Sequence, residues 1–253
     1  MLDGIKRWFT GSQATGTAGF EGVAAWADAA QYSFRGVQGE GFVVDGRLNT
    51  SLWRLEWGPS QRPYFSGGEL RLRAEPGVEA DLQLLVMTRA LQEQLEKSIF
   101  EQYVEDVQTR IDNQTPPEMR WLVMFPKLDG SDMGPLHEPY VALGNAKAWL
   151  LAWLQGPLSQ ALQVRAGDPT AHTGPDTDPL VLMLGRGRLM LRTSMAVPTV
   201  PEIKRCLQLF ETALREATRV QAENPGGLPS PSGGSDWGAS TTRGVLDSTP
   251  PKS

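Results

Sequence analysis

The side chains that could carry thiol or histidine chemistry are few and poorly placed for it. The chain has one cysteine, Cys206, and two histidines, His137 and His172. A single thiol excludes an intramolecular disulfide and any zinc site that needs several cysteines. Cys206 also falls on the apolar stripe of a predicted helix, where we expect a buried, inert thiol and no nucleophile.

Carboxylates near His172 are the remaining candidates for a metal site. The surrounding segment contains Asp168, Asp176 and Asp178. Their spacing matches no known metal loop, and Pro179 stands where a calcium loop would have glycine. We therefore expect turn-forming aspartates in a solvated loop, and we predict no metal and no cofactor. Catalytic carboxylates drawn from distant parts of the chain stay open as an alternative.

A glycine pair with flanking arginines resembles the start of a nucleotide-binding motif. Gly185-Arg186-Gly187 is followed by Met190 where the dinucleotide fingerprint has its third glycine. The segment also separates two predicted strands and opens no helix, so the fingerprint fails. We interpret it as a hairpin turn. Arg186 and Arg188 either bind an anion there or make the turn soluble.

Aromatic residues provide the preferred candidate for a binding surface. The chain has 8 tryptophans, and most of them are explained simply by a core. Tryptophan and tyrosine also anchor protein interfaces, however, and residues 57–65 place several aromatics beside a proline-containing turn. The predicted binding rim consists of Trp57, Arg62, Tyr64 and Phe65.

The two ends of the chain each carry a candidate contact segment. Residues 1–12 place apolar side chains on one helical stripe with Lys6 and Arg7 on its flank, which suits either a short interfacial membrane anchor or a terminal turn docked on the domain. In residues 221–253, 17 of the 33 residues are Gly, Pro or Ser, so we expect a disordered tail. Trp237 in that tail is either a linear anchor for a partner or a chance residue. The apolar side chains of the first segment are Leu2, Ile5, Trp8 and Phe9.

Composition indicates an ordinary globular protein. Hydrophobic residues make up 40% and charged residues 21% of 253, and the net charge is −5. This balance gives no support to nucleic-acid binding. No apolar run reaches the about 18 residues of a membrane span, and no secretory signal is apparent, so a cytoplasmic protein is expected.

Periodicity predicts an α+β fold in the order α-βββ(β)-α-β-α-ββ-α, an antiparallel meander and hairpin sheet packed by amphipathic helices. The meander covers 41–74, with a hairpin turn at Asp45-Gly46. Residues 82–87 are either a fourth strand or the start of the next helix. We expect one domain over 20–220, either undivided or with two lobes at 20–112 and 118–220. A flexible linker that ends at residue 19 precedes it. The other predicted elements are helices at 20–35, 89–111, 145–155 and from the Thr199–Glu202 capping box onward, one or two helical turns at 158–164, and strands at 120–125, 181–184 and 188–192.

This element order resembles the small α+β fold of secretion chaperones, with an extra strand and helix at 118–164. The resemblance implies an acidic, cytoplasmic protein that binds other polypeptides. Our first hypothesis is therefore a non-enzymatic interaction or chaperone-like protein with a protein partner. The alternatives are an enzyme that uses scattered Asp, Glu and Arg side chains, and a peripheral membrane protein anchored by residues 1–12.

Overall fold

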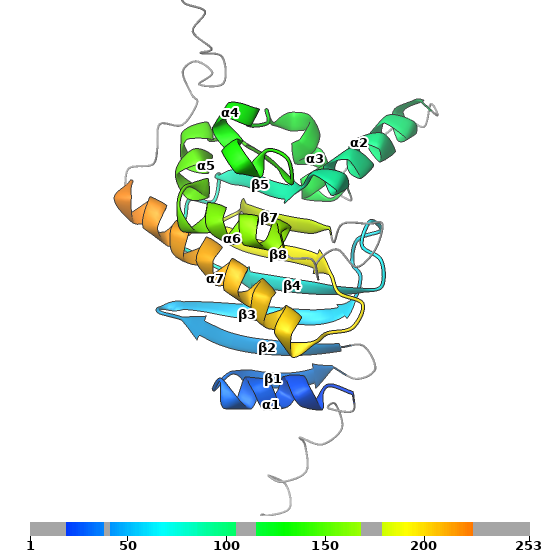
Figure 1. Ribbon diagram of the computed structural model, residues 1–253, viewed down its shortest axis with the longest axis vertical. Helices are drawn as coiled ribbons and strands as arrows, with labels where there is room; N and C mark the ends of the chain where they lie inside the picture. Colours follow the sequence, from blue (N-terminus) through cyan, green and yellow to red (C-terminus); the bar gives the residue numbers. More distant parts are fainter. Residues whose placement is uncertain (1–18, 38–40, 105–114, 168–178, 225–253) are drawn as a thin grey trace, which may run out of the picture.

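The computed structural model describes residues 19–37, 41–104, 115–167 and 179–224, which form one antiparallel sheet of eight strands with helices on both faces (Figure 1). The strand order across the sheet is β1-β2-β3-β4-β8-β7-β5-β6. The predicted α+β class and antiparallel sheet are confirmed, and the element order agrees except that five strands precede α2 where three or four were predicted. Strands from residues 20–112 and from 118–220 share this one sheet, because β4 pairs with β8 and β5 pairs with both β6 and β7.

Three strands within residues 41–74 form the predicted meander, and a strand at Ser33–Val37, which was not predicted, pairs with the first of them. Trp53 and Leu55 of one strand are buried on the same face of the sheet, as their alternation predicts. On the opposite face Glu56 forms ion pairs with Arg71 and Arg73 of the neighbouring strand, so the predicted complementary charges are confirmed. These strands are β1 (Ser33–Val37), β2 (Gly41–Leu48), β3 (Ser51–Pro59) and β4 (Gly68–Ala74).

Three of the other four strands are buried on both faces. In β5, Leu84 and Val86 face one apolar core, and Leu85 and Met87 face the other. A strand of this kind has no polar face, so its sequence is a continuous apolar run without alternation. The four strands are β5 (Gln83–Thr88), β6 (Tyr140–Gly144), β7 (Leu180–Gly185) and β8 (Arg188–Ser194), of which β8 joins the meander to the rest.

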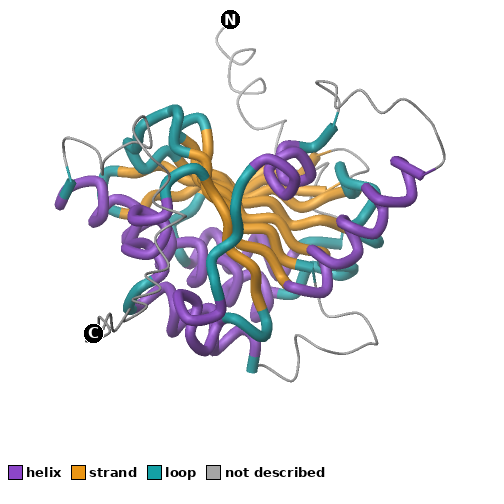
Figure 2. Tube along the Cα trace, turned by 90° about the horizontal axis from the view of Figure 1, so that it is seen from above, coloured by secondary structure: helices purple, strands orange, loops and turns teal. Residues whose placement is uncertain are grey.

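Helices cover the two faces unequally (Figures 1 and 2). The larger core lies beneath α7, which crosses the sheet diagonally beside α5 and α6 in Figure 1. The smaller core lies between α2, α3 and strands β5, β6 and β7. No helix in the described part of the chain is long and apolar enough to cross a membrane. The helices are α1 (Glu21–Ala29), α2 (Arg89–Val104), α3 (Pro117–Met124), α4 (Gly130–Met133), the 3₁₀ turn η1 (Gly134–Leu136), α5 (Lys147–Leu154), α6 (Pro157–Ala166) and α7 (Val200–Glu223).

The prediction of one helix over 20–35 is wrong, because α1 ends at Ala29 and β1 begins at Ser33. Gln31 adopts a left-handed conformation with φ 59°. The Gln31 N–H then donates to the Asp28 carbonyl, and the Tyr32 N–H donates to the Ala27 carbonyl. This pair of bonds is the Schellman arrangement that ends many helices.

The predicted turn at Asp45-Gly46 is also wrong, since β2 continues through both residues to Leu48. The turn lies at Asn49 and Thr50, where Asn49 has φ 52°. Gly46 is required by packing and not by a turn. It pairs with Trp53 across the strands, and a Cβ at this position would lie 2.2 Å from the Trp53 indole ring. The glycine therefore makes room for a buried tryptophan.

Residues 120–125 were predicted as a strand, but residues 120–124 belong to helix α3 and Phe125 follows its end. Pro117 occupies the first turn, where a missing N–H is tolerated. The run buries Trp121 and Leu122 and exposes Val123 and Met124, which is the pattern of a helix with one covered side. The single strand expected in this region is instead β6, which no prediction included. The segment 82–87, left open between strand and helix, is a strand from Gln83 onward, within β5.

The remaining predicted elements agree with the structure. Helix α5 lies within 145–155, and α6 extends the predicted turns at 158–164. Strands β7 and β8 flank the predicted hairpin turn. The Thr199 side chain caps α7 by accepting from the Glu202 N–H at 3.4 Å and donating to its carboxylate at 2.7 Å. The predicted helix 89–111 is observed to Val104, and its remainder lies outside the described residues.

Candidate binding cleft

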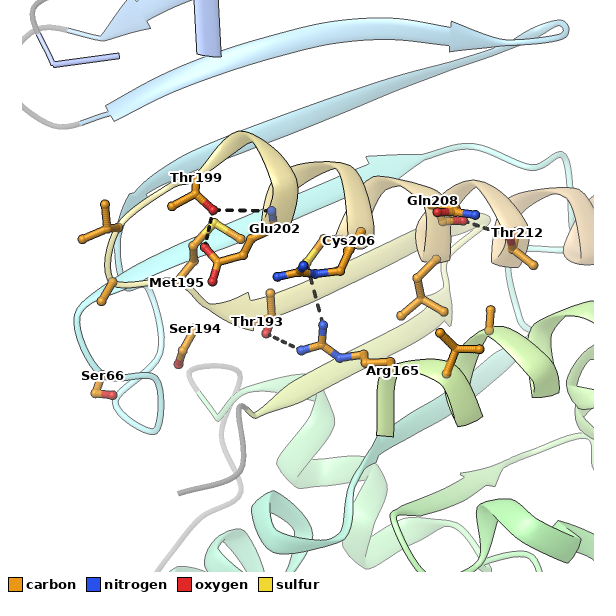
Figure 3. A pocket seen from close by; sticks show the side chains of 16 residues that line it. Ser66, Arg165, Thr193, Ser194, Met195, Thr199, Glu202, Cys206, Gln208 and Thr212 are labelled. Carbon is orange, nitrogen blue, oxygen red and sulfur yellow. Dashed lines mark hydrogen bonds between the residues drawn. The ribbon is translucent and has the colours of Figure 1, made fainter. Parts of the chain in front are cut away.

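A cleft of about 520 Å³ opens between α6 and the N-terminal half of α7, over the end of β8 (Figure 3). Its volume falls within the range of cavities that accommodate small ligands or a few side chains. Arg165 of α6 lies across it, facing Thr193 of β8 and Cys206 of α7. The lining also includes Ser66 from the β3–β4 loop and Ser194, Met195 and Val197 at and just beyond the end of β8.

Three hydrogen bonds from buried or half-buried aromatic side chains fix the walls of the cleft. The Tyr140 hydroxyl donates to the Leu162 carbonyl at 3.1 Å and ties α6 to β6. The Trp153 indole N–H donates to the Ala213 carbonyl at 3.0 Å and ties α5 to α7. The Trp57 indole N–H donates to the Met195 carbonyl at 2.8 Å and holds the chain where it leaves β8. The cleft is therefore a preformed feature of the packed domain.

The polar groups of the cleft mostly have partners within the protein. Arg165 donates to the Thr193 hydroxyl at 3.2 Å and contacts the Cys206 sulfur at 3.9 Å. Glu202 is held by Thr199 in the helix cap. The Ser194 hydroxyl is different, because it is buried and makes no hydrogen bond. Ser194 lies opposite Glu69 in the pairing of β4 with β8, so its side chain is on the face of the sheet away from Arg165.

Cys206 lines the cleft but is a poor nucleophile. The residue is buried, and this burial raises the pKa of the Cys206 thiol, an effect that Arg165 only partly offsets. The thiolate form is therefore scarce at neutral pH, as the sequence predicted for a thiol on an apolar helix face. Among the described residues, no group of three His, Cys, Asp or Glu side chains is arranged to hold a metal ion.

Exposed apolar side chains stand at the mouth of the cleft. Val164 is 75% exposed and Val197 is 69% exposed, and both belong to the lining. Seven large apolar side chains are exposed in the described part of the chain, and Val164 and Val197 are the two of them that line this cleft. Apolar surface beside a concave site is typical of binding surfaces.

The predicted binding rim over residues 57–65 lies next to the cleft, and its side chains are used within the domain. The Trp57 ring stacks on Phe42 while its N–H bonds Met195. Tyr64 and Phe65 are buried in the smaller core. Only the following residue, Ser66, lines the cleft itself. These side chains stay predictions as binding residues.

Arg62 and Tyr64 take part in a buried network with Glu118 of α3. The Glu118 side chain is fully buried, and one of its oxygens accepts from Arg62 at 2.5 Å and also from the Tyr64 hydroxyl. Burial and the nearby carboxylate raise the pKa of Tyr64. A second network joins Glu69 to Arg192 at 2.6 Å and to the Gln61 N–H at 2.7 Å. Together they fasten the loop that carries Ser66 to the sheet.

The other predicted site residues lie away from the cleft or outside the described residues. Arg186 is exposed at the β7–β8 turn with φ 55°, and Arg188 pairs with Glu75 at 3.3 Å. His137 is exposed near η1. The membrane-contact residues and the tail tryptophan fall outside the described residues, as does the second histidine. These are Leu2, Ile5, Trp8, Phe9, Trp237 and His172.

Sequence reasoning missed the cleft, because its lining comes from four separated segments. The sequence feature that could have indicated a binding surface is valine at positions expected to be polar and exposed, namely Val164 in α6 and Val197 just before the α7 cap.

Comparison with known proteins adds no further assignment, since no family model, no curated protein and no solved structure matches the chain. The resemblance in element order to secretion chaperones accordingly stays a prediction.

Proposed function

We propose that the protein is a non-enzymatic binding protein that holds a polypeptide segment in the cleft between α6 and α7. The observation that carries the proposal is the pair of exposed valines, Val164 and Val197, at the mouth of a preformed cavity of about 520 Å³. An extended peptide would cover these apolar side chains and insert one or two of its own into the cavity.

The chemistry of the lining favours binding over catalysis. A nucleophile needs a base in hydrogen-bonding reach, yet the Cys206 sulfur contacts a guanidinium and its thiol pKa is raised. The Glu202 carboxylate is engaged in capping α7. What the cleft offers a ligand is shape, apolar surface and hydrogen-bonding groups.

The enzyme and the membrane-anchored protein remain alternative predictions. Liposome flotation of the protein with and without residues 1–12 tests the membrane-anchored alternative.

Site-specific photocrosslinking in the native host tests the proposal. A benzophenone amino acid is placed at Val164 or Val197, and in matched controls at Leu52 or Val123, which are 64% and 57% exposed but lie outside the cleft. We expect discrete polypeptide adducts from the two cleft positions and none of the same mass from the controls. The same adducts from all four positions, or no adduct from the cleft positions, would contradict the proposal.

A further inference from the structure

Strand β1 is an edge of the sheet whose outer backbone groups have no partner in the described part of the chain. Its inner side pairs with β2, and no backbone group of Ser33–Val37 bonds to any other described element. The opposite edge differs, because beside β6 the Leu128 N–H donates to the Ala142 carbonyl and Lys127 bridges to Leu143. A sheet edge with free N–H and C=O groups can accept a further strand.

Arg35 lies at the centre of this edge and has no counterion. Its side chain is exposed, and it forms no ion pair with any described residue. The carboxylates of the neighbouring strands on this face, Asp45 and Glu56, already pair with arginines of β3 and β4. Across this face of β1–β4, five arginines oppose three carboxylates, although the whole chain has a net charge of −5. The edge therefore suits an acidic segment. The charged residues of the face are Arg35, Asp45, Arg47, Arg54, Glu56, Glu69, Arg71 and Arg73.

The other face of β1 is apolar. Phe34 is half-buried there and stacks on Phe42 of β2, with the ring centres 5.8 Å apart. Helix α1 packs on this side through Val23 and Ala27, which belong to the larger core, so α1 lies on the side away from Arg35. Successive side chains of a strand point to opposite faces. A strand added beside β1 would therefore place alternate side chains next to Arg35 and the others next to Phe34.

We propose that β1 accepts an extended segment of another polypeptide as a ninth strand, with acidic side chains facing Arg35 and apolar side chains facing Phe34. A second copy of this chain is disfavoured, because antiparallel pairing of β1 with itself over Ser33–Val37 sets Arg35 opposite Arg35. Nucleic acid is disfavoured as well, since the Arg35 face of β1–β4 has no aromatic side chain on which bases could stack. Strand β1 contributes no residue to the cleft lining, so this site is separate from that of the proposed function.

Synthetic peptides test the inference on the full-length protein. A short peptide that alternates Glu with Val is compared with one that alternates Lys with Val, and with a form of the Glu peptide whose backbone nitrogens are methylated on both edges. Affinities are measured by isothermal titration calorimetry for the wild type, Arg35→Glu, Arg35→Lys and a control. The control, Arg186→Glu, changes an exposed arginine of the β7–β8 turn. Hydrogen exchange with mass spectrometry locates the bound peptide.

We expect the wild type and Arg186→Glu to bind the Glu peptide at least tenfold more tightly than the other two peptides, about 1.4 kcal/mol, with slower amide exchange in Ser33–Val37. Arg35→Lys is expected to keep this preference, and Arg35→Glu to favour the Lys peptide. A reversed preference also shows that the Arg35→Glu variant is folded, because a misfolded protein would lose both peptides.

Several results would overturn the inference. They are no binding of the Glu peptide, equal binding of the Glu and Lys peptides, undiminished binding of the methylated peptide, and protection from exchange only outside β1. A single-stranded oligonucleotide of thymidine is titrated in parallel, and tighter binding of it than of the Glu peptide would overturn the inference in favour of nucleic acid.

Discussion

Glu69 provides a demanding test of how the β3–β4 loop is held near the cleft. Its side chain is fully buried, and its carboxylate accepts from Arg192 at 2.6 Å and from the Gln61 N–H at 2.7 Å. Replacement of Glu69 by Ala leaves Arg192 buried without its counterion. Removal of one member of a buried pair costs about 3–5 kcal/mol, so we expect the free energy of unfolding to fall by that amount.

Urea denaturation followed by tryptophan fluorescence measures the change, and two further variants make it specific. Glu69→Leu combined with Arg192→Met removes both charges, so we expect a loss within about 1–2 kcal/mol of the wild type. Glu56→Ala breaks ion pairs of a carboxylate that is 25% exposed and should cost less than about 1 kcal/mol. The reasoning fails if Glu69→Ala costs no more than Glu56→Ala, or if the double variant is as unstable as the single one.

Three further predictions concern packing, capping and ionisation. Gly46→Ala forces a Cβ to within 2.2 Å of the Trp53 ring and should cost about 1–3 kcal/mol in thermal denaturation, while Gly22→Ala, with open space around it, should not destabilise. Thr199→Ala should cost about 1 kcal/mol, and Thr199→Ser should restore most of it. Burial raises the pKa of Tyr140 from 10.0 to about 12. The unfolded chain therefore releases this proton first, so stability should fall between pH 10 and 12 by up to about 1.4 kcal/mol per pH unit, and Tyr140→Phe should lessen the fall.

The sequence was sufficient where one face of a strand meets water. In β3 and β4, charged residues alternate with buried ones, so the direction of Trp53, Leu55 and Glu56 follows from spacing alone. The cap of α7 was also predictable, because Thr199 and Glu202 make their hydrogen bonds within one turn. Both features are local, and tertiary packing reinforces them.

The sequence was insufficient where burial or backbone geometry overrides the local pattern. Strand β6 is buried on both faces, so it shows no alternation that distinguishes it from a helix or a loop. The apolar run in α3 has the same ambiguity. Helix α1 ends at a left-handed Gln31, a conformation usually signalled by glycine. These errors come from tertiary context that a short window of residues does not contain.

The cleft was beyond prediction for a different reason. Its lining joins Ser66, Arg165, Thr193 and Cys206, which the fold brings together from the β3–β4 loop, α6, β8 and α7. The pairing of β4 with β8 places the β3–β4 loop beside the end of β8. The aromatic rim predicted over residues 57–65 lies next to the cleft, where the Trp57 N–H donates to the Met195 carbonyl, and it stays a prediction as a binding surface.

Methyl NMR of the full-length protein tests the central claim most directly. A peptide taken from the polypeptide crosslinked at the cleft positions is titrated into protein labelled at Val, Leu and Met methyl groups. The account predicts shift changes at Val164, Val197 and Met195, with the signals of Leu52 and Val123 unchanged. Shift changes confined to Leu52, Val123 or other residues outside the cleft would contradict it.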